Sequence, residues 1–259
     1  MDILIGDIGN TITKICLVKI NNYKVKKIIY LESKNILKIK YLKRKLNKII
    51  KNKKINKIAL FSSVVPKYNL ILKKFLKKFY KINLKEIKEK KISKIVKINI
   101  KNRNQVGSDR IVNAVGVYKK YKTDCIVLDF GTATTFDVVT KKGIYNGGII
   151  APGVNLSMKS LSSSADQIPI FSLKKKKKII GKNTIEALHS GFYWGYVGLI
   201  NNIILKIEKE TKKKYRVIFT GGYANLFKTS IIRTFTVDRN ITIRGIIEIF
   251  KENKNYLTR

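Results

Sequence analysis

The chain of 259 residues contains few of the side chains that build disulfide frameworks and zinc centres, with two cysteines and one histidine. Cys16 and Cys125 lie in apolar, strand-like runs, where a free thiol usually acts as a small buried hydrophobe. This pattern predicts neither a disulfide framework nor a zinc site. A multi-histidine metal site is excluded, and a Ser/His/Asp triad would depend entirely on His189. We therefore expect any bound metal to have oxygen ligands, and His189 to have a packing or surface role.

Long apolar runs are also missing. None approaches the roughly 18 apolar residues that a helix needs to span a bilayer, and residues 1–6 lack a basic segment and a cleavage site. We expect a cytosolic protein with no membrane partner. The hydrophobic fraction of 44% is too high for a disordered chain. The sequence therefore indicates a folded globular protein of one large domain or two smaller ones.

Acidic residues are scarce beside basic ones, 16 against 56, which gives a formal net charge of +40. Such a charge ordinarily points to nucleic acid. However, lysine far outnumbers arginine and is spread along the chain beside abundant isoleucine and asparagine, as A/T-rich codons would produce. A functional patch would be expected to cluster and to include arginine for bidentate phosphate contacts. We expect no specific nucleic-acid partner.

The chain contains an internal echo. An apolar strand followed by Asp-x-Gly occurs at Asp7 and again at Asp129, 122 residues later, and a second apolar run follows each glycine as in a hairpin. Hydrophobic periodicity predicts three strands after each start. Alternating helices and strands are expected to follow in the first half, and a short helix, a long helix, two strands and a final helix in the second. The expected fold class is α/β, with two related halves, 1–120 and 121–259, each a mixed sheet flanked by helices.

The two Asp-x-Gly turns are candidate phosphate-binding elements. The turn exposes backbone N–H groups to phosphate oxygens, and the carboxylate can hold a cation that neutralises them. An ordinary hairpin explains either turn alone equally well, because Asp, Gly and Asn are common turn residues. Two copies in the same context favour a two-sided clamp for the phosphates of a nucleotide.

A third candidate element is Gly107-Ser108-Asp109-Arg110, directly before an amphipathic helix. Asp109 could simply cap that helix. Alternatively, it could act as a general base toward a substrate hydroxyl, with Arg110 holding an anionic group. Two glycine-rich segments, 147–153 and 220–222, are weaker indications of backbone that a ligand can approach. We expect a helix directly after Gly222.

Taken in order, these segments resemble the motif series of type III pantothenate kinases, from residue 2 to about residue 250. The block Gly107-Ser108-Asp109-Arg110 and the string Asp129-Phe130-Gly131-Thr132-Ala133-Thr134-Thr135 carry most of the resemblance. It implies a cytoplasmic enzyme with two ribonuclease-H-like, actin-like halves. This enzyme transfers phosphate from ATP to pantothenate and gives 4'-phosphopantothenate, the first step of coenzyme A synthesis.

The resemblance also implies roles for particular residues. Asp109 corresponds to the proton acceptor, and Asp129 to the ligand of a monovalent cation, K⁺ or NH₄⁺, while Mg²⁺ accompanies ATP. Thr132 is expected to contact ATP, and Thr184 pantothenate. The other implied pantothenate contacts are Gly107, Ser108, Asp109 and Arg110, and the other implied ATP contacts are Asp7, Ile8, Gly9, Asn10, Thr11, Ile12 and Thr13. Family members are homodimers, so a long helix from residue 183 is expected to help form the dimer.

The chain departs from the family pattern at two positions. Ile100 and Arg103 stand where the family usually has a tyrosine, nine residues before the aspartate, and a proline. Loss of the tyrosine hydroxyl is expected to weaken substrate binding by about 0.5 to 1.5 kcal/mol. Two other functions fit parts of the pattern: a sugar or acetate kinase of the same architecture, and a basic regulator that retains the fold without turnover. Retention of Asp7, Asp109 and Asp129 argues against the second.

Overall fold

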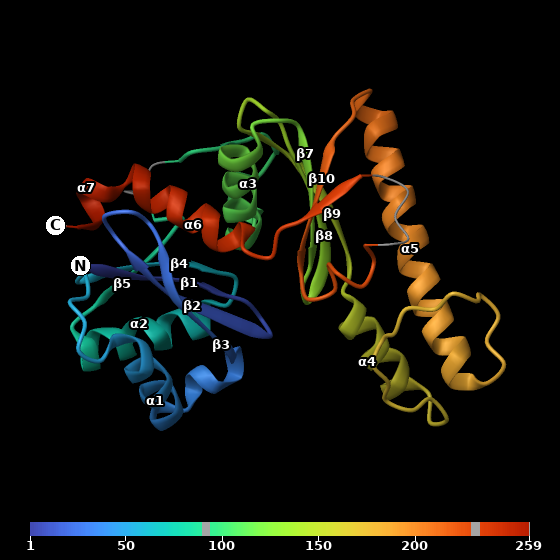
Figure 1. The fold of residues 1–259 in the computed structure, drawn as a ribbon, viewed down its shortest axis with the longest axis horizontal. Helices are drawn as coiled ribbons and strands as arrows, with labels where there is room; N and C mark the ends of the chain where they lie inside the picture. The colour runs from blue at the N-terminus through green and yellow to red at the C-terminus, as the bar shows by residue number, and fades with distance from the viewer. Residues whose placement is uncertain (90–93, 229–233, 259) are drawn as a thin grey trace. The chain divides into compact units, whose positions relative to one another are not determined.

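The computed structural model describes residues 1–89, 94–228 and 234–258. Its internal contacts divide the chain into two compact units (Figure 1). The first unit is Met1–Tyr121 together with Asn240–Arg259, and the second is Lys122–Arg239. The predicted division into related halves, 1–120 and 121–259, stays a prediction. Among the described residues, no helix is long and apolar enough to cross a bilayer.

The first unit is built on a five-stranded mixed sheet with the order β3-β2-β1-β4-β5. Strand β1 pairs antiparallel with β2 and parallel with β4, and β4 pairs parallel with β5. The carboxyl ends of β1, β4 and β5 therefore meet at one edge of the sheet. The strands are β1 (Asp2–Ile8), β2 (Ile12–Lys19), β3 (Val25–Glu32), β4 (Ile58–Ser63) and β5 (Asn83–Glu86).

Helices cover both faces of this sheet (Figure 1). On one face, α1 (Ile39–Ile50) and α2 (Pro66–Tyr80) bury their apolar sides against alternate residues of β1 and β4, such as Leu4 and Phe61. On the other face, α3 (Ser108–Tyr121) and α6 (Ile241–Glu252) pack against the same two strands. The remaining elements of this unit are the 3₁₀ turns η1 (Ser33–Leu37) and η2 (Arg103–Gln105), strand β6 (Lys97–Ile98) and helix α7 (Lys254–Leu257).

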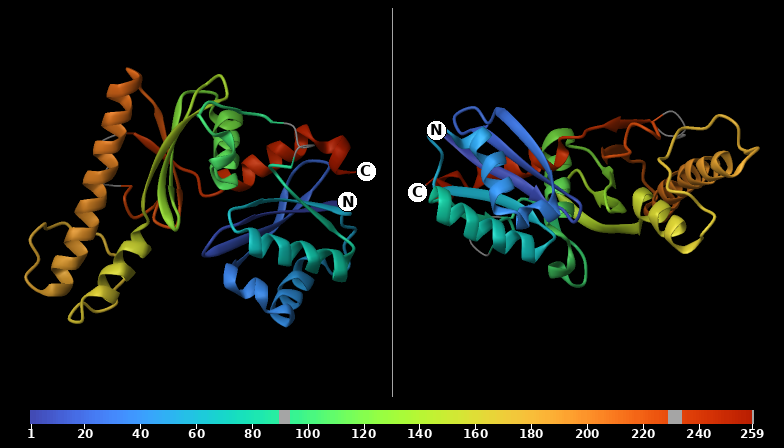
Figure 2. Two further views of the ribbon diagram at one scale, coloured as in Figure 1. Left: turned by 180° about the vertical axis from the view of Figure 1, so that it is seen from behind. Right: turned by 90° about the horizontal axis from the view of Figure 1, so that it is seen from below.

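The second unit repeats the hairpin and parallel pairing of the first. Its strands lie in the order β11-β10-β7-β8-β9, with β7 antiparallel to β8 and parallel to β10. The strands are β7 (Cys125–Phe130), β8 (Ala133–Val139), β9 (Ile144–Pro152), β10 (Arg216–Gly221) and β11 (Phe235–Val237). Figure 2 shows this sheet from two further directions.

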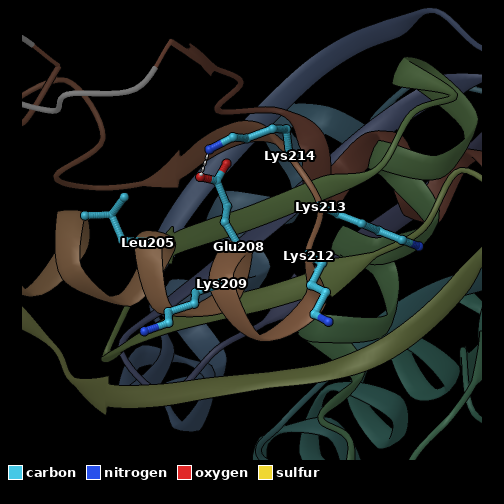
Figure 3. Close-up of a pocket in the computed structure, with 6 residues that line it drawn as sticks. All are labelled: Leu205, Glu208, Lys209, Lys212, Lys213 and Lys214. Atoms are coloured by element: carbon cyan, nitrogen blue, oxygen red, sulfur yellow. Dashed lines mark hydrogen bonds and ion pairs between the residues drawn. The ribbon is translucent and has the colours of Figure 1, made fainter.

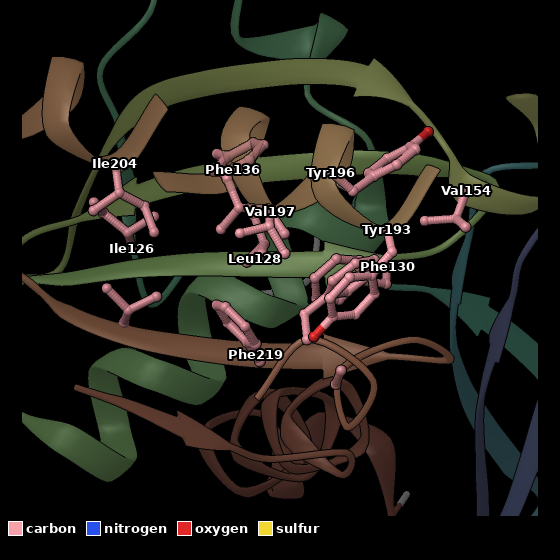
Figure 4. Packing of buried hydrophobic residues seen from close by; sticks show 14 of the residues in the cluster. Ile126, Leu128, Phe130, Phe136, Val154, Tyr193, Tyr196, Val197, Ile204 and Phe219 are labelled. Atoms are coloured by element: carbon pink, nitrogen blue, oxygen red, sulfur yellow. The ribbon is translucent and has the colours of Figure 1, made fainter. Parts of the chain in front are cut away.

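Helix α5 (Thr184–Thr211) covers one face of the second sheet, and α4 (Val154–Ser164) packs beside its first turns. Phe130 and Phe136 point from the sheet toward Tyr193 and Val197 of α5 (Figure 4). The Phe130 ring stacks on Phe227 with centroids 5.3 Å apart. Because side chains alternate along a strand, the opposite face carries the residues between these, including Asp129 and Thr220.

Two mixed sheets flanked by helices confirm the predicted α/β class, and three strands begin each unit, as predicted. The helix predicted directly after Gly222 is wrong: the described residues 222–228 are turns and bends. Local propensity is overridden here because Ala224 and Phe227 are fully buried in the core and hold this segment as tight turns. The N–H of Leu226 donates to the carbonyl of Tyr223, a single-turn hydrogen bond of 2.9 Å.

Helices α3 and α6 cross at very short range because each contributes a glycine. A Cβ on Gly116 would lie 2.5 Å from the carbonyl oxygen of Ile241, and one on Gly245 would overlap the carbonyl of Val112. Thr242 also donates a 2.8 Å hydrogen bond to Asn113 inside this contact. The middle of α3 is therefore held by backbone-to-backbone packing within the first unit.

We predict that Gly245→Ala lowers the free energy of unfolding by about 3 kcal/mol, because the added methyl group meets backbone atoms that cannot rotate away. Urea denaturation followed by circular dichroism measures the change. Arg244→Ala is the matched control, since Arg244 is the preceding residue of α6 and is exposed; it should change stability by less than about 0.5 kcal/mol. Equal effects of the two variants would contradict the close packing.

Candidate active site

The first Asp-x-Gly turn joins β1 to β2, with Asp7 one residue before the end of β1. The N–H of Gly9 donates to the carbonyl of Ile12 over 3.2 Å and closes the turn. Ser33 fixes it from the side, because its hydroxyl donates to the carbonyl of Gly9 and its N–H to that of Thr11. Asn10, Thr11 and Ile12 are exposed, and Thr13 is buried and shares a hydrogen bond with Ser33. The turn is thus rigid at its base and open at its tip.

The Gly107–Arg110 block forms the first turn of α3. Asp109 is the second residue of the helix, and its Oδ1 accepts the N–H of Arg110 over 2.8 Å. Its carboxylate lies over Gly107, where a Cβ would be 2.5 Å from Oδ1. Asp109 thus lies where the helix dipole stabilises negative charge. It is half-buried, so both the capping and the general-base interpretations remain open to it.

These two elements lie along the same edge of the first sheet. The N–H of Val64, directly after β4, donates to the carbonyl of Ile8 over 3.1 Å. Val64 also lies 3.4 Å from the position of a Cβ on Gly107. In the register of β1 with β4, Asp7 is opposite Ser62, on the face that α3 covers. The structure therefore brings Asp7 and the Gly107–Arg110 block together within one unit.

Glu86 ties this edge to the start of α3. It ends β5, and its Oε1 accepts the Ser108 hydroxyl over 2.5 Å while Oε2 accepts the N–H of Lys88 over 2.7 Å. Burial raises the pKa of the Glu86 carboxyl, against the opposing effects of its hydrogen bonds from Ser108, Lys88 and the backbone of Ser63. The ammonium of Lys88 donates to the carbonyls of Asn104 and Val106, over 3.0 and 3.1 Å. Glu86 and Lys88 together clasp the chain on both sides of Gly107.

In the second unit, Asp129 lies near the end of β7, and the N–H of Gly131 donates to the carbonyl of Ala133 to close the turn. Thr132 is exposed at the tip. Gly221, with φ of +85°, ends β10 beside it: a Cβ there would lie 2.7 Å from Oδ1 of Asp129 and 2.6 Å from the backbone of Phe130. The glycine lets the Asp129 carboxylate lie directly against the β10 backbone.

Thr184 is the first residue of α5, and the Asn183 side chain caps the helix by accepting the N–H of Glu186 over 2.9 Å. Thr184 lines a groove between α4 and α5 that also includes Pro152 at the end of β9. Gly153, the next residue, lies against the carbonyl of Thr132. The end of β9 is therefore shared between the groove and the Thr132 turn.

A second hollow lies at the other end of α5 (Figure 3). Its lysines accompany Glu208, whose carboxylate pairs with the ammonium of Lys214 over 2.9 Å. Cations stabilise a helix C-terminus, so these lysines have a structural explanation. The hollow contains none of the predicted site residues.

A family model described as type III pantothenate kinase matches residues 3–206 of the chain. A type III pantothenate kinase from Pelagibacter ubique is 50% identical over 245 residues, which are 95% of this chain and 97% of that protein. The chain belongs to the type III pantothenate kinase family. This family phosphorylates pantothenate in coenzyme A biosynthesis, with ATP as the phosphate donor, and the predicted family and activity are confirmed.

Solved structures support the fold of this kinase. A Campylobacter jejuni protein described as a Baf family transcriptional activator aligns with a TM-score of 0.63 and 23% identity, covering 98% of this chain and 100% of its own. A protein described as a sugar kinase from Cytophaga hutchinsonii aligns with a TM-score of 0.51 and 13% identity, over 97% and 100% of the two chains. The predicted actin-like kinase fold is confirmed.

Sequence reasoning missed Glu86 and Lys88, which hold the chain on both sides of Gly107 by hydrogen bonds. Nothing in the local sequence distinguishes Glu86 from the other residues of a lysine-rich stretch, because its role depends on Ser108, 22 residues later. The one weak signal is that the short strand at residues 83–86 ends on an acidic residue.

We predict that Glu86→Gln changes how the stability of the kinase depends on pH. A raised pKa means that the folded state favours the protonated carboxyl, so its stabilising contribution is present at low pH and lost as pH rises through the folded pKa. The parent should therefore lose stability relative to the variant as pH rises from the ordinary glutamate pKa, about 4.3, through the raised pKa of the folded state. Urea denaturation of both proteins at each pH measures this, and a pH-independent difference would contradict it.

Proposed function

We propose that Asp109 is the proton acceptor when this chain transfers the γ-phosphate of ATP to the hydroxyl of pantothenate, giving 4'-phosphopantothenate. The observation that carries the proposal is the clasp of Glu86 and Lys88 around the start of α3, at the sheet edge that also bears Asp7. A kinase aspartate works mainly by position, because the transferred phosphoryl group has little bond order to either oxygen in the transition state. A cytoplasmic location, predicted from the sequence, is part of the same proposal.

In the proposed reaction, the hydroxyl oxygen of pantothenate forms the new bond to the γ-phosphorus as the bond to the β,γ-bridging oxygen breaks. The hydroxyl proton passes to Asp109, and ADP leaves. Gly107, Ser108, Arg110 and Thr184 contact pantothenate in this proposal. Arg110, half-buried on α3, supplies a guanidinium that suits the pantothenate carboxylate.

The ATP contacts are proposed at the two turns. The residues from Asp7 to Thr13 supply a tip whose backbone is open to phosphate oxygens, and Thr132 supplies a second exposed tip. Mg²⁺, bound with ATP, would neutralise charge on the phosphates as it builds up. Asp7 is the carboxylate of the first turn that suits such a hydrated ion.

Asp129 is proposed to bind the monovalent cation. The residues fit such an ion: Oδ1 of Asp129 lies near the ends of two strands, 2.7 Å from the position of a Cβ on Gly221 and 4.0 Å from one on Gly131. One carboxylate with neutral oxygen ligands suits a singly charged cation. Bound there, the cation would reduce the negative charge around the phosphates.

We further propose that the chain forms a homodimer through α5. Ala187, Gly191 and Gly195 follow one another at four-residue spacing along the groove, and a Cβ on either glycine would meet nothing within 4 Å. Leucine side chains flank this stripe, and Leu161 is 36% exposed. Small residues let a second helix approach closely while apolar neighbours lose water, so the face suits a second copy of itself.

Asp109→Asn is expected to lower kcat for ATP-dependent phosphorylation of pantothenate about 10²- to 10⁴-fold, because the amide cannot take the proton. The amide oxygen can still accept the N–H of Arg110, so the fold should persist. Asp166→Asn is the matched control, since Asp166 is exposed in a loop, and it should retain parental activity. Full activity of the Asp109 variant would refute the assignment.

Leu161→Arg should convert the dimer to a monomer in analytical ultracentrifugation, because it introduces a charge into the groove between α4 and α5. Leu70→Arg is the control: Leu70 is 53% exposed on α2 and is not among the residues that line the groove. It should sediment like the parent. If both variants remain dimeric, the α5 interface is wrong.

A further inference from the structure

Thr220, on β10, has a buried hydroxyl that the fold itself does not satisfy. The side chain is 1% exposed, and its Oγ1 has no hydrogen-bond partner among the described residues. A buried polar group without a partner costs about 1 to 3 kcal/mol. Such a group in a native structure calls for an explanation, and an unseen ligand is one of the common ones.

The position of Thr220 points to Asp129. In the parallel register of β10 with β7, Thr220 is directly opposite Asp129. Neighbouring strands lie about 4.8 Å apart, and opposed residues of a parallel pair project from the same face. That face is opposite the one that packs on α5, since the adjacent residues Leu128 and Phe219 belong to the α5 core. The hydroxyl and the carboxylate therefore share one face at the carboxyl end of two strands.

The Asp129 carboxylate also leans toward β10. Its Oδ1 lies 2.7 Å from the position that a Cβ on Gly221 would occupy, directly beyond Thr220. The two side chains make no hydrogen bond with each other that would satisfy the Thr220 hydroxyl. Two oxygen-bearing side chains that are opposed on one face of neighbouring strands and do not bond to each other suit a cation between them.

The first unit repeats the arrangement. Ser62 on β4 is opposite Asp7 on β1 in the parallel register, as Thr220 is opposite Asp129. Ser62 is fully buried, and its hydroxyl likewise lacks a partner in the described part of the chain. The same pairing of a carboxylate with an unsatisfied hydroxyl therefore accompanies both Asp-x-Gly turns, which argues against a chance packing defect in either unit.

We propose that Thr220 is a ligand of the monovalent cation at Asp129, with its hydroxyl oxygen completing the coordination that the carboxylate begins. This rests on the proposed cation role of Asp129. The donor set explains the charge of the ion: one carboxylate and one neutral hydroxyl offer less negative charge than the several carboxylates typical of Ca²⁺ sites. Thr220 would thus help to select a singly charged ion.

The test compares Thr220→Val with Thr134→Val. Both threonines are buried in the same sheet with unsatisfied hydroxyls, but Thr134 is opposite Phe130, on the face toward α5. Binding of K⁺ is followed by the rise in melting temperature at constant ionic strength, and binding of Tl⁺ by thallium-205 NMR, with MgATP present and pantothenate omitted. These readouts do not require turnover.

Thr220→Val should raise the half-saturating K⁺ and Tl⁺ concentrations at least about tenfold, because losing even a residue that only orients a metal ligand typically lowers metal affinity about 10- to 100-fold. Thr134→Val should leave them within about twofold of the parent, and Thr220→Ser, which restores a hydroxyl, should recover most of the affinity. Parental cation affinity in Thr220→Val would overturn the proposal, even if that variant melts at a lower temperature.

Asp129→Asn distinguishes the contribution of Thr220 from the cation role of Asp129 itself. Loss of the cation response in Asp129→Asn with retention in Thr220→Val would overturn the role of Thr220 alone. If the parent itself gives no response to K⁺ or Tl⁺, both cation assignments fail. Phosphorylation of pantothenate by the parent, measured separately, would still stand in that case.

Discussion

Parallel pairing of β1 with β4, and of β7 with β10, is the constraint on which the rest of the structure depends. In each unit it gathers the carboxyl ends of strands at one edge, where side chains are not needed for the core. Alternation along each strand then separates two tasks: Leu4 and Phe61, or Leu128 and Phe219, enter apolar clusters, while Asp7 and Asp129 face the other way. One register error would exchange the two sets.

Some polar side chains at the carboxyl edges of the two sheets lower the stability of the fold and yet lie beside the candidate site residues. Glu86 is a half-buried carboxylate whose ionisation is disfavoured by loss of water, yet it holds Ser108 at the start of α3. Ser62 and Thr220 are buried hydroxyls that lack partners within the described residues. Such local conflicts with good packing are expected at functional sites and are offset by the surrounding core.

The internal echo has a physical meaning in the structure. Both Asp-x-Gly segments begin an antiparallel hairpin whose first strand also pairs in parallel with a later strand. Differences between the units lie in what covers the sheet. In the first unit α1 and α2 cover the sheet face that corresponds to the face covered by α5 in the second. Helix α5 also forms, with α4, a groove lined by Gly191 and Gly195.

The sequence by itself determined the α/β class, the two hairpin starts, the extent of α5 and the kinase family, because these depend on local periodicity and on short runs such as Gly107–Arg110. The structure contains both hairpins and the long helix α5, as predicted. The roles of the site residues themselves stay predictions. Tertiary structure alone decided the turns after Gly222, which Phe227 holds by packing in the core. It also decided that Glu86 accepts the Ser108 hydroxyl and that Thr220 lies opposite Asp129. Residues 22 or 91 positions apart are brought together by strand register, which no local pattern encodes.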